Sequence, residues 1–318
     1  GKVVPLSEAK LGVMTHALLY GTALFEGIRG NWNEQREQTY LFRLADHYER
    51  LLKGCRLLNI ELPYSVGELC RITIEMVGRC QFKEDIYVRP LAYKSSESLG
   101  VRLHDLQADF TVFAIPWGPY LDMDKARCAV SSWRRPADNS IPPQAKITGL
   151  YVNNALAKTE AINNGFDEAI MLSPDGHVSE GSGENIFLVI NGKLVTPPTY
   201  DSILMGFTRD TVMTLAADEL GLEVVERPID RGELYIAEEC FLTGTAAHIT
   251  PVSEIDYRPV GSGEVGENTR KLQTIYADVI RGNNAKYLAW CTPCYEKAAE
   301  LAGKSAKGNG RVRRAKKA

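Results

Sequence analysis

A lysine that follows a proline-rich segment constrains this chain more than any other feature. Residues 140–151 read Ser-Ile-Pro-Pro-Gln-Ala-Lys-Ile-Thr-Gly-Leu-Tyr, so Lys146 lies among small and apolar residues. Pro142 and Pro143 forbid a helix and fix an extended entry, and Gly149 permits a turn or the close approach of another segment. Because burial disfavours the ammonium, we expect Lys146 to be a neutral, nucleophilic amine that forms Schiff bases. A solvent-exposed lysine is the simpler alternative, since most lysines are exposed.

Composition narrows the class of protein. The 318 residues are 44% hydrophobic and 24% charged, as in ordinary globular proteins, and the length suggests about two domains. A net charge of −3 gives no general basic field that would favour nucleic acid. No apolar run approaches the ~18 residues of a membrane helix, and the first residues lack the apolar core of a secretory signal. Because the sequence starts without Met and reads like the second half of a hairpin, we expect a truncated or processed start.

The cysteine and histidine patterns predict reduced thiols and no metal. The seven cysteines are an odd number and five are widely scattered, which favours a cytoplasmic location. Cys291-Thr-Pro-Cys294 has the spacing of a redox or half-zinc site, but no second pair and no βαβ pattern accompanies it. The five histidines never occur at metal-ligand spacing, so we expect no protein-bound metal.

Several short segments favour anion binding or close backbone approach. In residues 179–185 (Ser-Glu-Gly-Ser-Gly-Glu-Asn), glycines flank a carboxylate near the end of a predicted strand. Residues 206–208 precede a predicted helix, where Thr208 is a natural N-cap and the helix N-terminus attracts anions; capping alone also explains this pattern. Residues 244–247 are a second run of small residues with free N–H groups. Arg89, inside an apolar strand, requires a partner or an anion.

Periodicity predicts helices and strands in two halves. Helices are expected over residues 43–59, from a Ser65 cap to about 81, 152–164 and 267–281, and strands over 85–93, 109–117 and 126–133. Type I′ hairpin turns are expected at Asp175-Gly176 and Asn191-Gly192. The loop at 94–108 is long enough to be a lid. We place a small N-terminal domain at 1–117, a linker at 118–124, a larger domain at 125–302 and a disordered basic tail at 303–318.

These parts together fit one cofactor. Pyridoxal phosphate requires a lysine for a Schiff base, a carboxylate that keeps the pyridine nitrogen protonated, and N–H groups with an arginine for the phosphate. The chain supplies each of these residue types. Lys158, in the middle of a predicted helix among polar residues, is the main rival to Lys146 as the reactive lysine.

Eight motifs, in order along nearly the whole chain, carry a family resemblance. They are HALLYGTALFEGIR at 16–29, YVRP at 87–90, PWGPYL at 116–121, SSWRRPADNSIPPQAKITGLY at 131–151, SEGSGENIF at 179–187, TPP at 196–198, GFTRD at 206–210 and FLTGTAAHITPV at 241–252. On these motifs the chain resembles the branched-chain amino acid aminotransferase family, the fold-type IV pyridoxal-phosphate enzymes. The resemblance implies an α/β (α+β) fold of two domains: a small N-terminal α/β domain and a larger C-terminal domain with a β-barrel-like core. The cofactor would lie between them.

The same resemblance implies roles for individual residues. The expected catalytic residues are Lys146 as the Schiff-base lysine, Glu180 as the partner of the pyridine nitrogen and Tyr151 as the donor to the ring oxygen. These three also hold the cofactor, whose phosphate would be held by Arg50, Thr208 and Thr245, with backbone N–H groups of Phe207 and Thr245.

Substrate contacts follow from the resemblance as well. Tyr87 and the amides of Thr245 and Ala246 resemble the site for the substrate α-carboxylate, and Arg89 resembles the residue that receives the distal carboxylate of glutamate. The side-chain pocket would be lined by Tyr20, Phe25, Tyr120 and the loop at 94–104.

The implied activity is transfer of an amino group between branched-chain L-amino acids (leucine, isoleucine and valine) and 2-oxoglutarate, with Lys146 moving the proton. A homodimer or higher homo-oligomer is implied, with part of the pocket from a partner subunit. A D-amino-acid or (R)-amine transaminase of the same fold is the alternative, followed by a lyase of the aminodeoxychorismate type and a non-catalytic binding protein. Leu150 and Pro119 depart from the family pattern and leave the exact substrate open.

Overall fold

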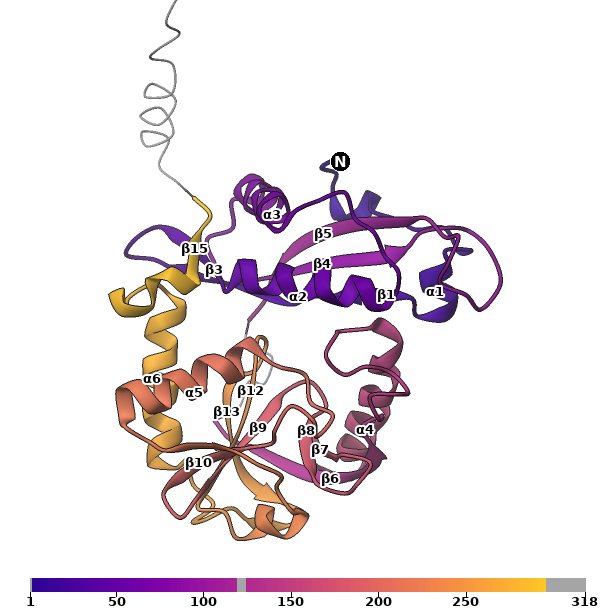
Figure 1. Cartoon of the computed structure of the whole chain (residues 1–318). Coiled ribbons are helices and arrows are strands. Elements are labelled where there is room, and N and C mark those ends of the chain that lie inside the picture. Colours follow the sequence, from indigo (N-terminus) through magenta and orange to yellow (C-terminus); the bar gives the residue numbers. More distant parts are fainter. Residues whose placement is uncertain (1, 119–123, 296–318) are drawn as a thin grey trace, which may run out of the picture.

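The computed structural model describes residues 2–118 and 124–295, which form two sheets stacked one above the other (Figure 1). The first sheet contains β1 (Ala23–Phe25), β2 (Ile28–Asn33), β3 (Gln38–Phe42), β4 (Ile86–Lys94), β5 (Ala108–Pro116) and β15 (Cys291–Pro293). With it are α1 (His16–Tyr20), α2 (Leu44–Leu57) and α3 (Val66–Cys80). The expected tail at 303–318, most of the expected linker and Tyr120 lie outside the described residues.

A proline divides one edge of strand β4 into two. Strands β1 and β2 both pair antiparallel with β4, β1 through residues 91–93 and β2 through 86–88. Pro90 lies between these two pairings and has no N–H to donate, so the regular ladder cannot continue through it. The Glu26 N–H still donates to the Pro90 carbonyl at 3.0 Å. Residues 26 and 27 are therefore a short break between β1 and β2.

The second sheet is curled and forms the centre of the larger half of the described chain (Figure 1). Its strand order is β11-β10-β9-β12-β13-β6-β7-β8, with β14 beside β13. The strands are β6 (Ala126–Arg134), β7 (Glu168–Leu172), β8 (Val178–Gly181), β9 (Asn185–Ile190), β10 (Lys193–Thr196), β11 (Val224–Glu226), β12 (Glu239–Gly244), β13 (His248–Ile255) and β14 (Arg258–Pro259). The helices are α4 (Tyr151–Asn163), α5 (Phe207–Leu220) and α6 (Glu267–Ile280). This arrangement agrees with the mixed α/β fold and barrel-like core that the resemblance implied.

The predicted helices follow from their apolar spacing and caps. In α2, Leu44, Tyr48, Leu51 and Cys55 recur at helical spacing and are buried in the core of the first half. Helix α3 begins after Ser65, whose hydroxyl accepts from the Glu68 N–H while the Glu68 carboxylate accepts from the Ser65 N–H. This capping box confirms the cap predicted from the sequence.

Two local predictions are wrong. Asn191 and Gly192 have φ values of 50° and 70°, as a type I′ turn requires, but of the other pair only Gly176 (95°) has a positive φ. That hairpin closes instead through the Ser173 N–H, which donates to the His177 carbonyl at 2.8 Å. Thr208 is not an N-cap: α5 is capped by Gly206, and Thr208 is buried in the first turn.

The end of the described chain returns to its beginning. Strand β15 pairs antiparallel with β3, with Thr292 opposite Leu41. Cys291 and Cys294 are free and buried at this edge rather than forming an exposed pair. Residues 291–293, from the C-terminal part of the chain, therefore add one strand to the sheet of the first of the two halves that we propose as domains.

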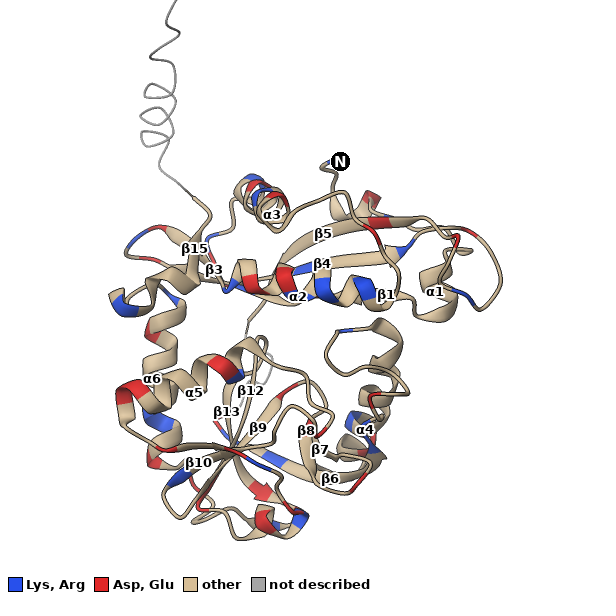
Figure 2. Cartoon of the chain, viewed as in Figure 1, with Lys and Arg blue, Asp and Glu red and all other residues tan. Residues whose placement is uncertain are grey.

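Lys and Arg residues alternate with Asp and Glu residues along the elements of both halves (Figure 2). None of the helices in the described ranges combines the length and the apolar character that crossing a bilayer requires.

Candidate active site

Backbone pairing between the two halves places the loop that carries Lys146. The Phe25 N–H donates to the Lys146 carbonyl at 3.1 Å, and the Gly149 N–H donates to the Gly21 carbonyl at 3.3 Å. Gly21 has a φ of 66°, and a Cβ there would lie 2.8 Å from the Gly149 Cα. Glycine is therefore required at position 21, whereas a Cβ at Gly149 would make only ordinary contacts, the nearest at 3.5 Å from the Gly21 carbonyl oxygen. The Gly21 backbone lies against Gly149, which confirms the close approach predicted there.

The Lys146 side chain points into a cavity between the two halves. The cavity has a volume of about 530 Å³ and contains, on its walls, most of the residues expected from the sequence. These are Phe25, Arg50, Tyr87, Arg89, Lys146, Tyr151, Glu180, Phe207, Thr208, Thr245 and Ala246.

Two other expectations, Tyr20 and the loop at 94–104, do not line this cavity, and a third concerns a residue outside the described ranges. Tyr20 is 37% exposed and accepts a hydrogen bond from the Gly100 N–H at 3.1 Å, away from the residues that line the cavity. The loop at 94–104 contributes no lining residue, and Tyr120 is not among the described residues. Lys158, the rival lysine, does not line the cavity and pairs with the buried Glu168.

Lys146 is more basic here than the sequence predicted. Burial lowers its pKa, but the Tyr151 oxygen, the Glu26 charge and the hydrogen bond from Nζ to Tyr151 Oη at 2.9 Å outweigh burial and raise the pKa above its ordinary value. The expectation of a neutral amine is therefore wrong for the cofactor-free chain. Its proton must be removed before the amine can act as a nucleophile or base.

Glu180 is held by three donors on strands and loops of the second half. Its Oε1 lies 3.0 Å from Arg135 Nη2, and its Oε2 accepts from Asn185 Nδ2 at 3.0 Å and from the Leu204 N–H at 2.9 Å. A carboxylate has about four acceptor positions, so one position is left for a donor in the cavity. Burial raises the pKa of Glu180, although Arg135 and the Leu204 N–H oppose this rise.

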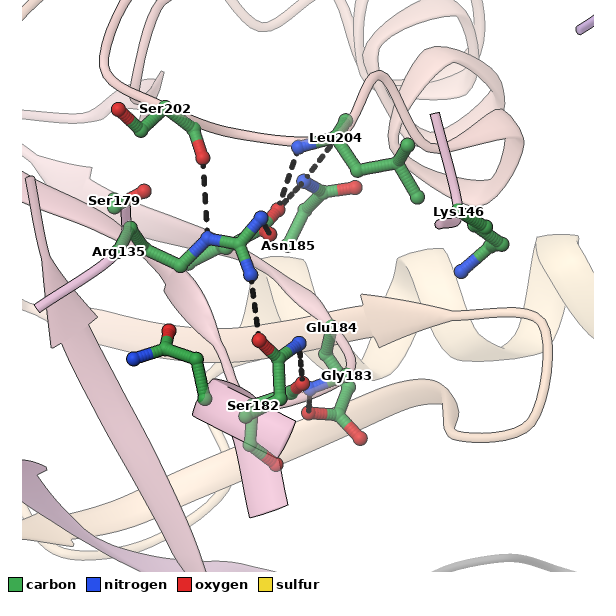
Figure 3. Close-up of polar contacts among 12 residues, drawn as sticks. Arg135, Lys146, Ser179, Ser182, Gly183, Glu184, Asn185, Ser202 and Leu204 are labelled. Atoms are coloured by element: carbon green, nitrogen blue, oxygen red, sulfur yellow. Dashed lines mark hydrogen bonds and ion pairs between the residues drawn. The ribbon is translucent and has the colours of Figure 1, made fainter. Parts of the chain in front are cut away.

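Arg135 is itself fixed by a buried network (Figure 3). Its Nη1 donates to Asn154 Oδ1 at 2.8 Å and its Nε to the Ser202 carbonyl at 3.2 Å. Asn154 in turn donates to the Ser182 carbonyl at 2.6 Å. Figure 3 also draws Lys146, which lines the same cavity as Glu180 and Asn154. The carboxylate and the amine are thus presented to one cavity from two different segments.

The part of the cavity wall at the start of α5 is rich in donors. Gly206, the N-cap of α5, has no side chain to occupy the first amides of the helix, and both Phe207 and Thr208 line the cavity. A Cβ at residue 206 would meet Asn185 Oδ1, so this position requires glycine. Thr243 Oγ1 is buried without a hydrogen-bond partner at the same cavity. Such a set of open donors fits an anion.

A second donor group lies near Phe25. Arg89 Nη2 donates to Tyr87 Oη at 2.8 Å, and the guanidinium carbon lies 4.4 Å from the centre of the Phe25 ring. The Arg89 Nε is buried without a partner. A Cβ at Gly27 would meet the Tyr87 hydroxyl, so glycine lets this tyrosine reach the cavity wall.

Sequence reasoning assigned no role to several polar residues of the site. They are Glu26, Arg135, Asn154, Glu184 and Asn185. Glu184 lines the cavity, and burial together with nearby Glu168 raises its pKa to about 8. Within the described part of the chain, no group of three or more His, Cys, Asp or Glu residues could hold a metal ion.

Comparisons with known proteins define the class to which this fold and cavity belong. The family model described as amino-transferase class IV matches residues 23–255. The crystal structure of a branched-chain aminotransferase from Thermoproteus uzoniensis superposes with a TM-score of 0.89 at 46% identity, covering 93% of this chain and 97% of that one. The enzyme from Thermobaculum terrenum gives a TM-score of 0.88 at 39% identity, over 93% and 96% of the two chains.

Sequence relatives narrow the assignment. A probable branched-chain-amino-acid aminotransferase of Aquifex aeolicus is 51% identical over 298 residues, which cover 93% of this chain and 96% of the relative. The branched-chain-amino-acid aminotransferase of Pseudomonas aeruginosa is 40% identical, over 92% of this chain and 95% of its own. The chain therefore belongs to the class IV aminotransferases and, among them, to the branched-chain-amino-acid aminotransferase family, as its motifs predicted.

Proposed function

We propose that this enzyme uses pyridoxal 5′-phosphate to move an amino group between L-leucine, L-isoleucine or L-valine and 2-oxoglutarate. The observation that carries the proposal is the presence of Lys146 and Glu180 on the walls of one cavity, which is also lined by the first residues of α5, whose amides no side chain caps. The Thermobaculum terrenum relative is described in its pyridoxal-phosphate form.

The residues present fit the cofactor. Lys146 would hold it covalently through Nζ, Glu180 would accept from the ring nitrogen through its fourth acceptor position, and Tyr151 would donate to the ring oxygen. The phosphate would be held by Arg50, by the first amides of α5 and by Thr208 and Thr245. The unpartnered Thr243 hydroxyl agrees with a polar ligand at this end. When bound, the cofactor supplies an electron sink for the carbanion at the substrate Cα.

The chain's own residues supply proton transfer and orientation. Once uncharged, Lys146 Nζ removes the proton from the substrate Cα and later returns one, as a general base and acid. Tyr151, 2.9 Å from Nζ, keeps the amine directed into the cavity between these steps. Arg135 and Asn185 keep the Glu180 carboxylate in place.

Two features of the cavity support the substrate pair. Phe25, Leu91 and Phe113 provide apolar wall for a branched side chain, and Arg89 provides a cation with unused donors for the distal carboxylate of glutamate. Among the solved relatives, the Thermoproteus uzoniensis enzyme is described with norvaline, and another branched-chain aminotransferase, 41% identical to this chain, with N-(5′-phosphopyridoxyl)-L-glutamate. One cavity that takes both apolar and acidic side chains agrees with these descriptions.

A substrate panel tests the proposal. The purified full chain with added cofactor is assayed with 2-oxoglutarate and, separately, L-leucine, L-valine, D-alanine and (R)-1-phenylethylamine, and glutamate formation is measured. We expect turnover of the two L-amino acids. Faster turnover of D-alanine or of the amine would replace the proposal by the D-amino-acid or (R)-amine alternative, and pyruvate release from aminodeoxychorismate would indicate a lyase.

We also propose three properties that follow from the sequence. These are a homodimer or higher homo-oligomer with a shared pocket, a cytoplasmic location and the domain boundaries at 118–124. Sedimentation of the purified chain would measure its oligomeric state.

A further inference from the structure

Glu26 is a buried carboxylate outside the cavity, and it holds Arg50, a cationic residue that lines the cavity. Glu26 is 1% exposed and accepts hydrogen bonds from Arg50 Nε and Nη2, both at 2.7 Å, and from His47 Nδ1 at 2.7 Å. It does not line the cavity, whereas its neighbours Phe25 and Gly27 do. Side chains in an extended chain alternate in direction. Because Phe25 and Gly27 line the cavity, the Glu26 side chain between them points the other way, to His47 and Arg50 of helix α2.

The contacts of Arg50 leave a defined part of its guanidinium for a ligand. The group has five N–H donors. Two donate to Glu26, and Nη1 donates to the Met205 carbonyl at 2.6 Å. Two N–H groups therefore remain, one on each terminal nitrogen, on a residue that lines the cavity.

Aromatic packing fixes the plane of the same group. The Arg50 guanidinium carbon lies 4.3 Å from the centre of the Phe207 ring, and the His47 ring lies 4.5 Å from that ring at 70°. Phe207 is the first residue of α5, whose first amides no side chain caps, and it lines the cavity. Glu26, His47 and Arg50 are thus tied to the helix terminus that offers the other anion donors.

We infer that Glu26 is a positioning residue for the phosphate end of the site: its carboxylate holds the Arg50 fork so that the two free N–H groups point at the phosphate. This inference rests on the proposed function. Fixing a guanidinium before the ligand arrives reduces the ordering cost of binding, and bidentate contacts to phosphate depend on orientation.

The alternative role for Glu26 is simple charge neutralisation, and it predicts the opposite sign. The negative charge of Glu26 offsets the attraction of Arg50 for a phosphate. If only charge mattered, Glu26→Gln would strengthen binding of a phosphorylated ligand. If Glu26 positions Arg50, the same substitution weakens that binding.

Matched ligands with and without phosphate separate these roles. Pyridoxamine 5′-phosphate and pyridoxamine cannot condense with lysines, and their dissociation constants for the cofactor-free full chain are measured by calorimetry. For Glu26→Gln we expect Kd for the phosphorylated ligand to rise by about tenfold, the effect of one lost charge-assisted hydrogen bond, and Kd for pyridoxamine to stay within about twofold. In an Arg50→Ala background, the Glu26 substitution should have no further effect.

The control is Glu49→Gln, on the same helix, where an exposed carboxylate lies 3.7 Å from Lys53 Nζ; it should change neither constant. Glu26→Asp keeps the buried charge if the glutamine variant does not fold, and the same selective loss is expected from its shorter reach. Tighter binding of the phosphorylated ligand, an equal loss for both ligands, or additive effects with Arg50→Ala would overturn the inference. If the wild-type chain binds neither ligand, the proposed function fails as well. If the wild-type chain prefers the phosphorylated ligand and both Glu26 variants keep that preference unchanged, only this inference fails.

Discussion

Arg135→Met tests how strongly the second half depends on its buried ion pair. Arg135 and Glu180 lie 3.0 Å apart with side chains 2% and 7% exposed. Two unit charges at this distance attract by roughly 5 kcal/mol at an effective dielectric constant of about 20. Methionine keeps an unbranched stem but is shorter and carries no charge, so Glu180 is left buried without its cation. We expect the free energy of unfolding to fall by roughly 3–5 kcal/mol at pH 8.

The pH dependence of this loss has a definite sign. Burial already raises the pKa of Glu180, and removal of Arg135 raises it further. An acid with a raised pKa in the folded state destabilises that state as pH rises above its ordinary value of about 4.3. At lower pH Glu180 is protonated in both folded and unfolded chains. The cost of Arg135→Met should therefore shrink steadily as pH falls from 8 towards 5.

Urea unfolding of the full chain, followed by circular dichroism at several pH values, measures the effect. The matched control is Arg231→Met, because Arg231 also lies 3.0 Å from a carboxylate, that of Asp256, but its side chain is 51% exposed. An exposed pair contributes about 0–1 kcal/mol. Equal losses for the two variants, or a loss for Arg135→Met that grows at lower pH, would refute the reasoning.

Three further predictions concern single residues. Lys146→Ala should abolish the visible absorbance of the bound cofactor and reduce turnover at least about 10²-fold, whereas Lys158→Ala should keep the absorbance; the reverse result would contradict the assignment of Lys146. Ser65→Ala removes one half of a capping box and should cost about 1 kcal/mol, measured by thermal unfolding, and an unchanged midpoint would argue against the cap. Glu184 has a pKa of about 8, so it destabilises the fold progressively between its ordinary pKa and pH 8. Glu184→Gln should remove that decline in urea midpoints between pH 6 and pH 9, and a parallel decline in both proteins would show that another group causes it.

The local features of the fold could be predicted because each depends on neighbouring residues. The apolar stripe of α2, the Ser65 cap and the Asn191-Gly192 turn are set within one helix or one hairpin. The wrong predictions have specific causes. At Asp175 a longer loop provides an alternative to the two-residue turn. At Gly206 the backbone, packed against Asn185, places the N-cap two residues before Thr208, so the helix begins at Phe207.

The reactive residues could be predicted, but the residues that hold them could not. Lys146 stands out through its unusual lead-in, and resemblance supplied the roles expected for Glu180 and Arg50. The partners Glu26 and Arg135 are 24 and 45 positions away from the groups that they contact, and nothing in the local sequence records such pairings. One available signal was the charged residue directly after Phe25, which was expected to line the pocket, because neighbouring side chains in an extended segment point in opposite directions. The basicity of Lys146 was also missed, because it depends on the Tyr151 hydroxyl and on the charge of Glu26, 120 positions away in the sequence.

Strand β15 has a consequence for how this chain is made. It is the outermost strand of the first sheet, yet it consists of residues 291–293. During synthesis from the N-terminus, β3 therefore exposes an unpaired edge until nearly 250 more residues have left the ribosome. An open edge of that kind pairs readily with other chains. Shortening the chain before residue 291 would make this transient exposure permanent, and aggregation through β3 would be its expected outcome.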